Sequence, residues 1–157
     1  MSDDILRIAN CSGFYGDRLS AAEEMVDGGP IDVLTGDYLA ELTMMILFKD
    51  RMKTPNAGYA RTFLRQMETV LGKCIQRGIK VVVNAGGLNP AGLAGEMEQL
   101  ATRLGVRAKI AYVDGDDLLP HLPELPEGAG GMRGSGQCQG HSGPGGRRRQ
   151  ASRAKPP

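Results

Sequence analysis

Residues 81–90 read Val-Val-Val-Asn-Ala-Gly-Gly-Leu-Asn-Pro, and the other predicted elements are arranged around this stretch. Three β-branched residues that stop at Asn84 predict a short buried strand, and the pair Gly86 and Gly87 predicts a tight turn after it. Asn89 can cap a helix, and the proline that follows it suits a first helical turn. The stretch is therefore a strand that leads into a helix, whose free N–H groups would favour a carboxylate or a phosphate.

The composition is that of a globular protein, with 41% hydrophobic and 24% charged residues in a chain of 157. The formal net charge is +1, but six of the 19 Lys and Arg residues lie in 128–157, whereas all 18 Asp and Glu residues precede that segment. Residues 1–127 are therefore acidic, which argues against nucleic acid as a partner.

The cysteines and the hydropathy pattern indicate a cytoplasmic protein. Cys11, Cys74 and Cys138 are odd in number and lack the spacing of a metal site, so we expect reduced thiols rather than disulfides. No apolar run approaches the roughly 18 residues of a membrane span, and the first residues do not resemble a secretion signal. We expect no membrane partner.

Strands and helices are predicted to alternate along the chain. Strands are expected over residues 5–11, 31–35, 81–83 and 106–113. Helices are expected from Asp17 or Ser20 to Val26, over residues 38–49 and 59–77, and from the Asn89 cap to Leu104. The helix over residues 38–49 is apolar on most sides, which predicts that it is largely buried. This order indicates an α/β class, a three-layer αβα fold with a mainly parallel, Rossmann-like or flavodoxin-like sheet.

The composition changes at residue 128. Residues 128–157 hold nine glycines and a basic end but no Ile, Leu, Val or aromatic residue, so they cannot form a core and are expected to be disordered. We therefore place one α/β domain at residues 1–127 and a Gly/Arg/Pro-rich tail at residues 128–157.

Ligands of open parallel sheets bind beyond the carboxyl ends of the strands, which here selects the loops at residues 12–17, 36–38, 84–89 and 114–117. The glycine loop lacks the Lys and Ser/Thr of a nucleotide-binding P-loop, since Leu93 and Ala94 stand in their places. No G-x-G-x-x-G turn follows any strand either. Two interpretations of Gly86 and Gly87 stay open: a ligand cradle, or only a tight turn.

Five aspartates lie at the predicted strand ends, where they could bind a hard cation or act as an acid/base pair. They are Asp17, Asp37, Asp114, Asp116 and Asp117. Aspartate also serves in turns and helix caps, so each has a structural alternative. We single out Asp37 and Asp114 as catalytic candidates because each follows an apolar strand closely.

Cys11 is a third candidate, because a thiol near a helix start can become a nucleophile. Neither histidine is close to it in the sequence, and a buried, inert thiol is the alternative. Cys74 lies on the apolar face of its helix and is expected to be core.

Four stretches together resemble the amino-terminal part of the acyclic terpene utilisation AtuA-like family. They are R-I-A-N-C-S-G-F-Y-G-D-R at residues 7–18, D-V-L-T-G-D-Y-L-A-E-L at 32–42, V-V-V-N-A-G-G-L-N-P at 81–90 and Y-V-D-G-D-D at 112–117. The resemblance covers about residues 5–125. It implies a role in bacterial breakdown of terpenoids such as citronellol and geraniol, through acyl-CoA esters, and assigns neither a reaction nor a cofactor.

The resemblance also implies that the strand-end loops line one site for a small molecule that carries a carboxylate or a phosphate, such as an acyl-CoA. Its ligand-binding candidates are Ser12, Gly13, Tyr15, Gly16, Asp17, Arg18, Gly36, Tyr38, Asn84, Gly86, Gly87 and Asn89.

The similarity is to a longer protein, and the tail resembles a GC-rich gene translated in the wrong frame. We therefore expect a truncated or frameshifted chain with an incomplete sheet, whose open edge invites self-association. A non-catalytic metabolite-binding or scaffold subunit is the alternative function.

Overall fold

The computed structural model describes residues 5–118, 121 and 123, and its strands form one parallel sheet. The strands are β1 (Ile8–Asn10), β2 (Val33–Gly36) and β3 (Lys80–Val83), in the order β1-β2-β3. Ile8 is level with Val33, and Val33 with Lys80, which fixes the register. The chain divides into two units, Met1–Asp117 and Leu118–Pro157, and the α-helices and strands of the described residues lie in the first. The proposed boundary at residue 128 lies outside the described residues.

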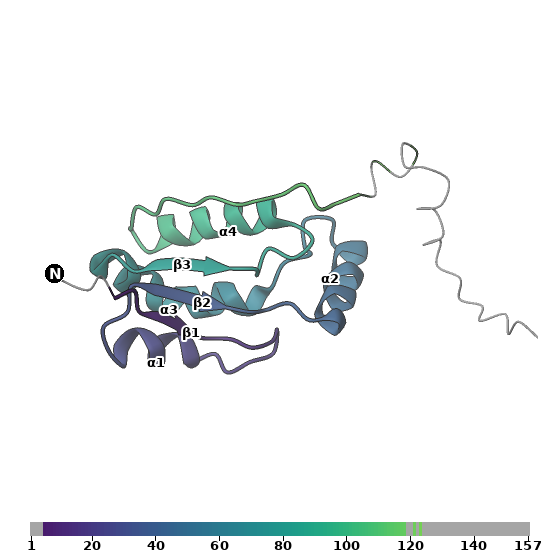
Figure 1. Ribbon diagram of the computed structural model, residues 1–157. Coiled ribbons are helices and arrows are strands. Elements are labelled where there is room, and N and C mark those ends of the chain that lie inside the picture. Colours follow the sequence, from purple (N-terminus) through teal and green to yellow (C-terminus); the bar gives the residue numbers. More distant parts are fainter. Residues whose placement is uncertain (1–4, 119–120, 122, 124–157) are drawn as a thin grey trace, which may run out of the picture. The chain divides into compact units, whose positions relative to one another are not determined.

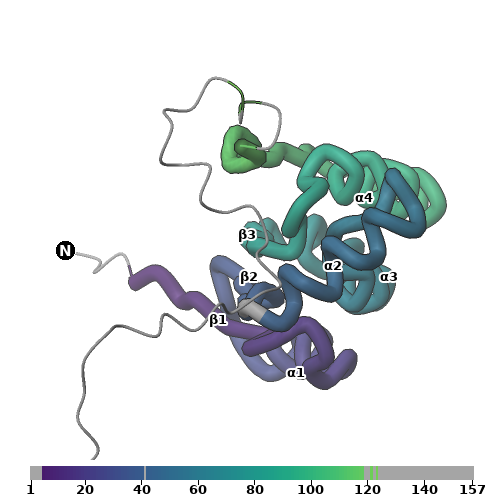
Figure 2. The backbone as a smooth tube through the Cα atoms, turned by 90° about the vertical axis from the view of Figure 1, so that its right-hand side faces the viewer, coloured from purple at the N-terminus to yellow at the C-terminus, as the bar shows by residue number. Residues whose placement is uncertain are grey.

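Three helices cover one face of this sheet (Figures 1 and 2). They are α1 (Ala21–Asp27), α3 (Arg61–Arg77) and α4 (Pro90–Arg103). Crossovers between parallel strands are right-handed, so crossovers that step in the same direction across a sheet place their helices on the same side. The sequence order β1-β2-β3 is such a progression.

The other face of the sheet is open in the described part of the chain. Ile8 is 61% exposed and Val82 is 62% exposed on that face, whereas Leu34, on the helix side, is fully buried. The α/β class with an incomplete parallel sheet is confirmed. Residues 5–118 do not form the second helix layer that a three-layer fold requires.

The core lies between the sheet and α1, α3 and α4. Helix α3 has the clear apolar face that its sequence predicts, and it ends at Gly78, whose φ of 70° is the left-handed conformation of a helix stop. The largest side chains that are fully or almost fully buried in this region are Val26, Leu34, Tyr38, Gln66, Met67, Val70, Cys74 and Leu100.

Helix α4 begins as the sequence predicts. The Asn89 side chain accepts a hydrogen bond from the Gly92 N–H at 2.9 Å, and Pro90 occupies the first turn. The cap satisfies one of the N–H groups that a helix start leaves without an intrahelical partner.

The fourth predicted strand, residues 106–113, is wrong as a strand. No ladder forms there, although the segment runs in the same direction as β3 (Figure 1). Val106, Ala108 and Ile110 are partly buried against the core, while Arg107 and Lys109 are exposed. The alternating pattern thus predicted correctly which side chains face the core. An extended segment can show that pattern without forming backbone hydrogen bonds to a neighbouring strand.

The helix predicted over residues 38–49 also differs from its prediction. Helix α2 runs from Glu41 to Lys53 and lies at the carboxyl end of the strands, not on a face of the sheet (Figures 1 and 2). The expectation that it is largely buried is wrong: its exposed apolar side chains are Leu42, Met45, Phe48 and Met52. The local sequence pattern predicted an apolar helix. Burial, however, requires other segments that pack against the helix, and residues 5–118 cover α2 on one side only.

Candidate functional site

Hydrogen bonds join the loops that follow the three strands. The Asp37 N–H donates to the Ser12 carbonyl oxygen at 2.8 Å, which ties the β2 loop to the β1 loop. The Tyr38 N–H donates to the Asn84 side-chain oxygen at 2.8 Å, which ties the β2 loop to the β3 loop. The carboxyl edge of the sheet is therefore one connected surface, as the parallel order predicts.

Asp37 is the exposed carboxylate at the centre of this surface. The Asn84 side-chain N–H donates to Asp37 Oδ1 at 2.6 Å, and the Leu39 N–H donates to the same oxygen at 3.1 Å. These donors lower the pKa of Asp37, the Asn84 bond being the larger cause. Asp37 is therefore a fixed, ionised carboxylate, which suits it to accept hydrogen bonds or bind a cation and not to donate a proton near neutral pH.

Tyr38 and Cys11 lie beneath the surface and not on it. Tyr38 is 1% exposed, and its hydroxyl donates to Gln66 Oε1. The Cys11 sulfur lies 3.7 Å from that hydroxyl oxygen, and the Tyr38 ring meets Phe63 edge-on with centroids 5.6 Å apart. Burial raises the pKa of both the Cys11 thiol and the Tyr38 phenol. This arrangement favours the inert thiol over the nucleophile.

Gln66 is a residue that sequence reasoning missed. It is 1% exposed, and its amide donates to the Arg18 carbonyl oxygen at 3.2 Å while its oxygen accepts from Tyr38. It stands beside Met67 on the buried face of α3, and a glutamine among apolar positions was the available signal.

The β1 loop is held mainly by bonds within itself. Asp17 accepts from the Gly13 N–H at 2.9 Å and from the Arg18 N–H at 2.7 Å, and these bonds lower its pKa. The Arg18 guanidinium pairs with Glu24 at 2.7 Å. Asp17 thus performs the turn-forming role that was its structural alternative.

The remaining β1-loop candidates have structural partners as well. The buried Ser12 hydroxyl donates to the Phe14 carbonyl oxygen at 2.9 Å, and the Tyr15 carbonyl oxygen accepts from the Thr62 hydroxyl at 2.8 Å. Gly16 is exposed, with the Phe14 ring beside it.

The glycines are required by packing. A Cβ on Gly87, which has a φ of 53°, would collide with the Leu47 side chain and lie 2.8 Å from the Gly58 carbonyl oxygen. A Cβ on Gly86 would lie 2.8 Å from Pro90 Cβ. Gly36 likewise has the Tyr38 ring against it. The close neighbours of Gly86 and Gly87 are the protein's own atoms, which supports the tight-turn interpretation.

The β3–α4 loop also uses its own donors. The N–H groups of Gly87, Leu88 and Asn89 donate to carbonyl oxygens at 3.3, 2.8 and 2.9 Å. The Asn89 side-chain amide donates to the Asn56 carbonyl oxygen at 3.0 Å. Fewer donors therefore face outward than the sequence suggested for a phosphate cradle.

Arg51 of α2 is a second residue that the sequence did not single out. Its guanidinium donates to the Leu88 carbonyl oxygen at 3.0 Å and lies 3.6 Å from the Asp117 carboxylate. It therefore links α2, the glycine loop and the chain after residue 113. Asp114 and Asp116 are exposed.

The aspartates do not gather into a metal centre in the described part of the chain, where no group of three or more His, Cys, Asp or Glu residues could hold an ion.

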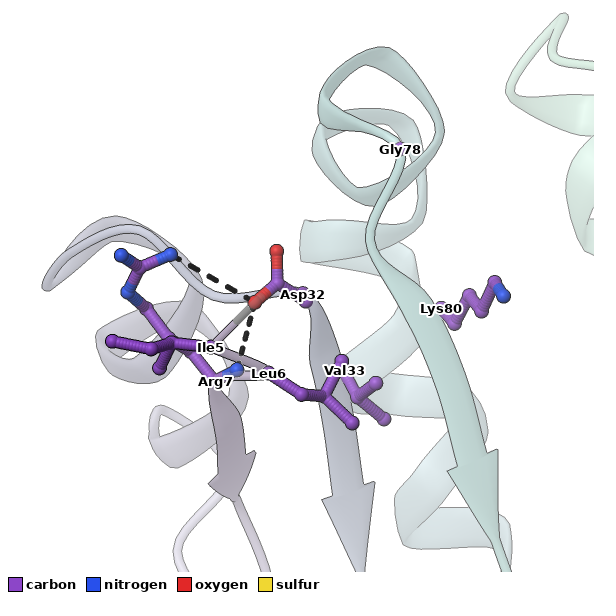
Figure 3. Close-up of a pocket in the computed structure, with 7 residues that line it drawn as sticks. All are labelled: Ile5, Leu6, Arg7, Asp32, Val33, Gly78 and Lys80. Carbon is purple, nitrogen blue, oxygen red and sulfur yellow. Dashed lines mark hydrogen bonds and ion pairs between the residues drawn. The ribbon is translucent and has the colours of Figure 1, made fainter. Parts of the chain in front are cut away.

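A pocket of about 550 Å³ lies at the opposite, amino edge of the strands (Figure 3). The Arg7 N–H donates to Asp32 Oδ2 at 2.7 Å there, and the Lys80 side chain extends away from that pair. Its lining residues are Ile5, Leu6, Arg7, Asp32, Val33, Gly78 and Lys80. None of these belongs to the predicted site.

Among the described residues, no helix has both the length and the apolar character needed to cross a membrane.

Comparison with known proteins identifies the family. Searches of the curated proteins and of the solved structures gave no significant match. The family model described as acyclic terpene utilisation family protein AtuA matches residues 6–139, which extends past the residue 125 expected from the sequence stretches. Because this match covers most of the 157 residues, the chain belongs to the acyclic terpene utilisation family.

Proposed function

We propose that this chain takes part in terpenoid or branched acyl catabolism and binds a small acyl ligand, such as an acyl-CoA, at the carboxyl edge of its sheet. Family membership supports the pathway class. The free thiols of Cys11 and Cys74 fit the reducing environment of the cytoplasm, where we place the protein.

The observation that carries the proposed site is the Asp37–Asn84 pair. A carboxylate that is exposed, ionised and oriented by a side chain from another strand is ready to accept a hydrogen bond from a ligand. The buried Tyr38, Cys11 and Gln66 form a rigid support beneath it. Asp114 follows the segment that runs alongside β3 and is the second candidate at this edge.

The test uses the full chain with acyl-CoA esters of acyclic terpenoid acids as probes, because their pantetheine amide N–H groups can donate hydrogen bonds to the ionised Asp37 carboxylate. Asp37→Asn should weaken binding about tenfold, because it replaces a charged acceptor by a neutral one. Asp32→Asn is the matched control, since it removes the same charge at the far end of β2. Equal affinities for Asp37→Asn and the unchanged protein would overturn the proposed site.

A non-catalytic binding or scaffold subunit is the second candidate function. It is favoured because burial raises the pKa of the thiol and the phenol nearest Asp37 and hides both groups. A ligand that raises the melting temperature by binding the folded state, without any turnover, would support this alternative. Turnover that Asp37→Asn abolishes would contradict it.

A further inference from the structure

Helix α2 has two apolar faces and only one of them is covered by residues 5–118. Thr43 and Leu47 are buried against the rest of the molecule. At about 100° per residue, the exposed apolar side chains fall on one arc of about 120° on the other side of the helix. These side chains, which we call the α2 outer face, are Leu42, Met45, Phe48 and Met52, and each is between 50% and 73% exposed. Lys49 lies within the same arc, but four neighbouring apolar side chains that are each at least half exposed form a patch typical of an interaction surface.

The charges around the α2 outer face differ between its two ends. Lys49 and Lys53 are exposed near the carboxyl end of α2, while the Arg51 side chain turns away to bond Leu88 and Asp117. The ionised Asp37 carboxylate lies just before the amino end. If a second α2 packs antiparallel against the first, the basic carboxyl end of each helix therefore lies near the acidic amino end of the other.

We propose that the α2 outer face pairs antiparallel with the same face of a second copy of this chain. A twofold axis near Met45 sets Leu42 of each helix against Phe48 of the other and brings Lys53 towards Asp37 of the other copy. Each surface then meets its own equivalent, which is the condition for a closed symmetric dimer.

The size of the α2 outer face sets the strength of the pairing. Four side chains that each lose roughly 100 Å² bury roughly 800 Å² over both copies, which is below the range of stable interfaces. We therefore expect a weak and reversible dimer that dissociates on dilution. The two methionines suit such an interface, because their unbranched side chains adapt to a partner surface.

The pairing would also place two candidate ligand sites side by side. Leu47 lies against Gly87, and Arg51 holds the Leu88 carbonyl oxygen, so α2 is attached to the glycine loop. The dimer contact is argued from the outer face and from the charges at the two ends of α2, and it does not require Asp37 to bind a ligand.

Sedimentation velocity of the full chain, from about 5 µM to about 500 µM, tests the pairing over the range in which a weak dimer dissociates. The mass should rise from the 16.7 kDa of the monomer to twice that value, and Met45→Glu should keep the protein monomeric throughout. Val82→Glu is the matched control, because it adds the same charge to the exposed sheet face and should leave the dimer intact. A monomer at every concentration, or a dimer that Val82→Glu breaks and Met45→Glu does not, would overturn the proposal.

A cross-linking test covers the case in which Met45→Glu does not fold. In a Cys138→Ser background, Met45→Cys should give a disulfide-linked dimer on mild oxidation, because Cys11 and Cys74 are buried. Val82→Cys should remain monomeric. Binding of the monomer to anionic phospholipid vesicles through the outer face, without any cross-linked dimer, would show that a membrane covers α2 and would equally overturn the proposal.

Discussion

Asn84 does more for the candidate site than any other single side chain. It donates to Asp37 and accepts from the Tyr38 N–H, so one amide fixes both the carboxylate and the backbone beside it. Asn84→Ala should destabilise the fold by about 1 kcal/mol, as expected for lost hydrogen bonds of this kind. Urea unfolding measures this loss, and Asn56→Ala is the control, since the Asn56 side chain is exposed. An effect no larger than that of Asn56→Ala would contradict this role.

The same bond predicts a pH dependence at the residue scale. The pKa of Asp37 is lowered in the folded state, so its contribution to stability is present above the ordinary aspartate pKa and is lost as the pH falls through the lowered value. Asn84→Ala should raise the pKa of Asp37 and weaken the acid dependence of unfolding. NMR titration of the Asp37 carboxyl tests this directly, and an unchanged pKa would refute it.

Cys11 predicts a negative result with thiol reagents. Its burial and raised pKa should make it as slow to react at neutral pH as Cys74, whose pKa burial also raises. Labelling of a Cys138→Ser variant followed by mass spectrometry measures both rates. A Cys11 that reacts many times faster than Cys74 would restore its role as a nucleophile.

Among the elements, some turns require a glycine, whereas some glycines within helices can be replaced. Gly87→Ala should destabilise the protein by about 1–3 kcal/mol, because a left-handed φ and a collision with Leu47 and Gly58 act together. Gly95→Ala in α4 meets nothing within 4 Å and should stabilise it by about 0.5–1 kcal/mol. Thermal unfolding of the two variants checks the opposite signs, and a neutral Gly87→Ala would contradict the packing account.

The elements also show what the sequence could and could not predict. The start of α4 follows from adjacent residues, Asn89 and Pro90, and was predicted because a helix cap is a local device. The partial burial of α2 depends on segments distant in the chain, so its apolar composition alone wrongly predicts that it is largely buried. Residues 106–113 keep the predicted alternation without a ladder, because backbone pairing depends on the neighbouring strand and not on the pattern.

The candidate site divides in the same way. Strand-end position placed Asp37 and Asn84 at one edge, and the structure joins them. Strand-end position did not reveal that Tyr38 is a core residue, because an aromatic residue after a strand suits either a ligand surface or a packed interior. Gln66 stands among the apolar positions of α3, which is a signal in the sequence, but its partners Tyr38 and the Arg18 carbonyl oxygen follow only from the packing of α3 against the β1 and β2 loops.

In the whole molecule, the two edges of the sheet differ in what they hold. The carboxyl edge holds hydrogen-bonded loops around Asp37, and the amino edge holds the pocket beside Arg7 and Asp32. Open α/β sheets bind ligands at the carboxyl edge, so the acyl-CoA esters proposed above are the first ligands to test there.

Amide chemical-shift mapping of the full chain with these ligands tests that assignment most directly. We expect shifts at Ser12, Asp37, Leu39 and Asn84 that grow with ligand concentration and disappear in Asp37→Asn. Shifts confined to Arg7, Asp32 and Lys80 would place the ligand at the amino edge and contradict the account.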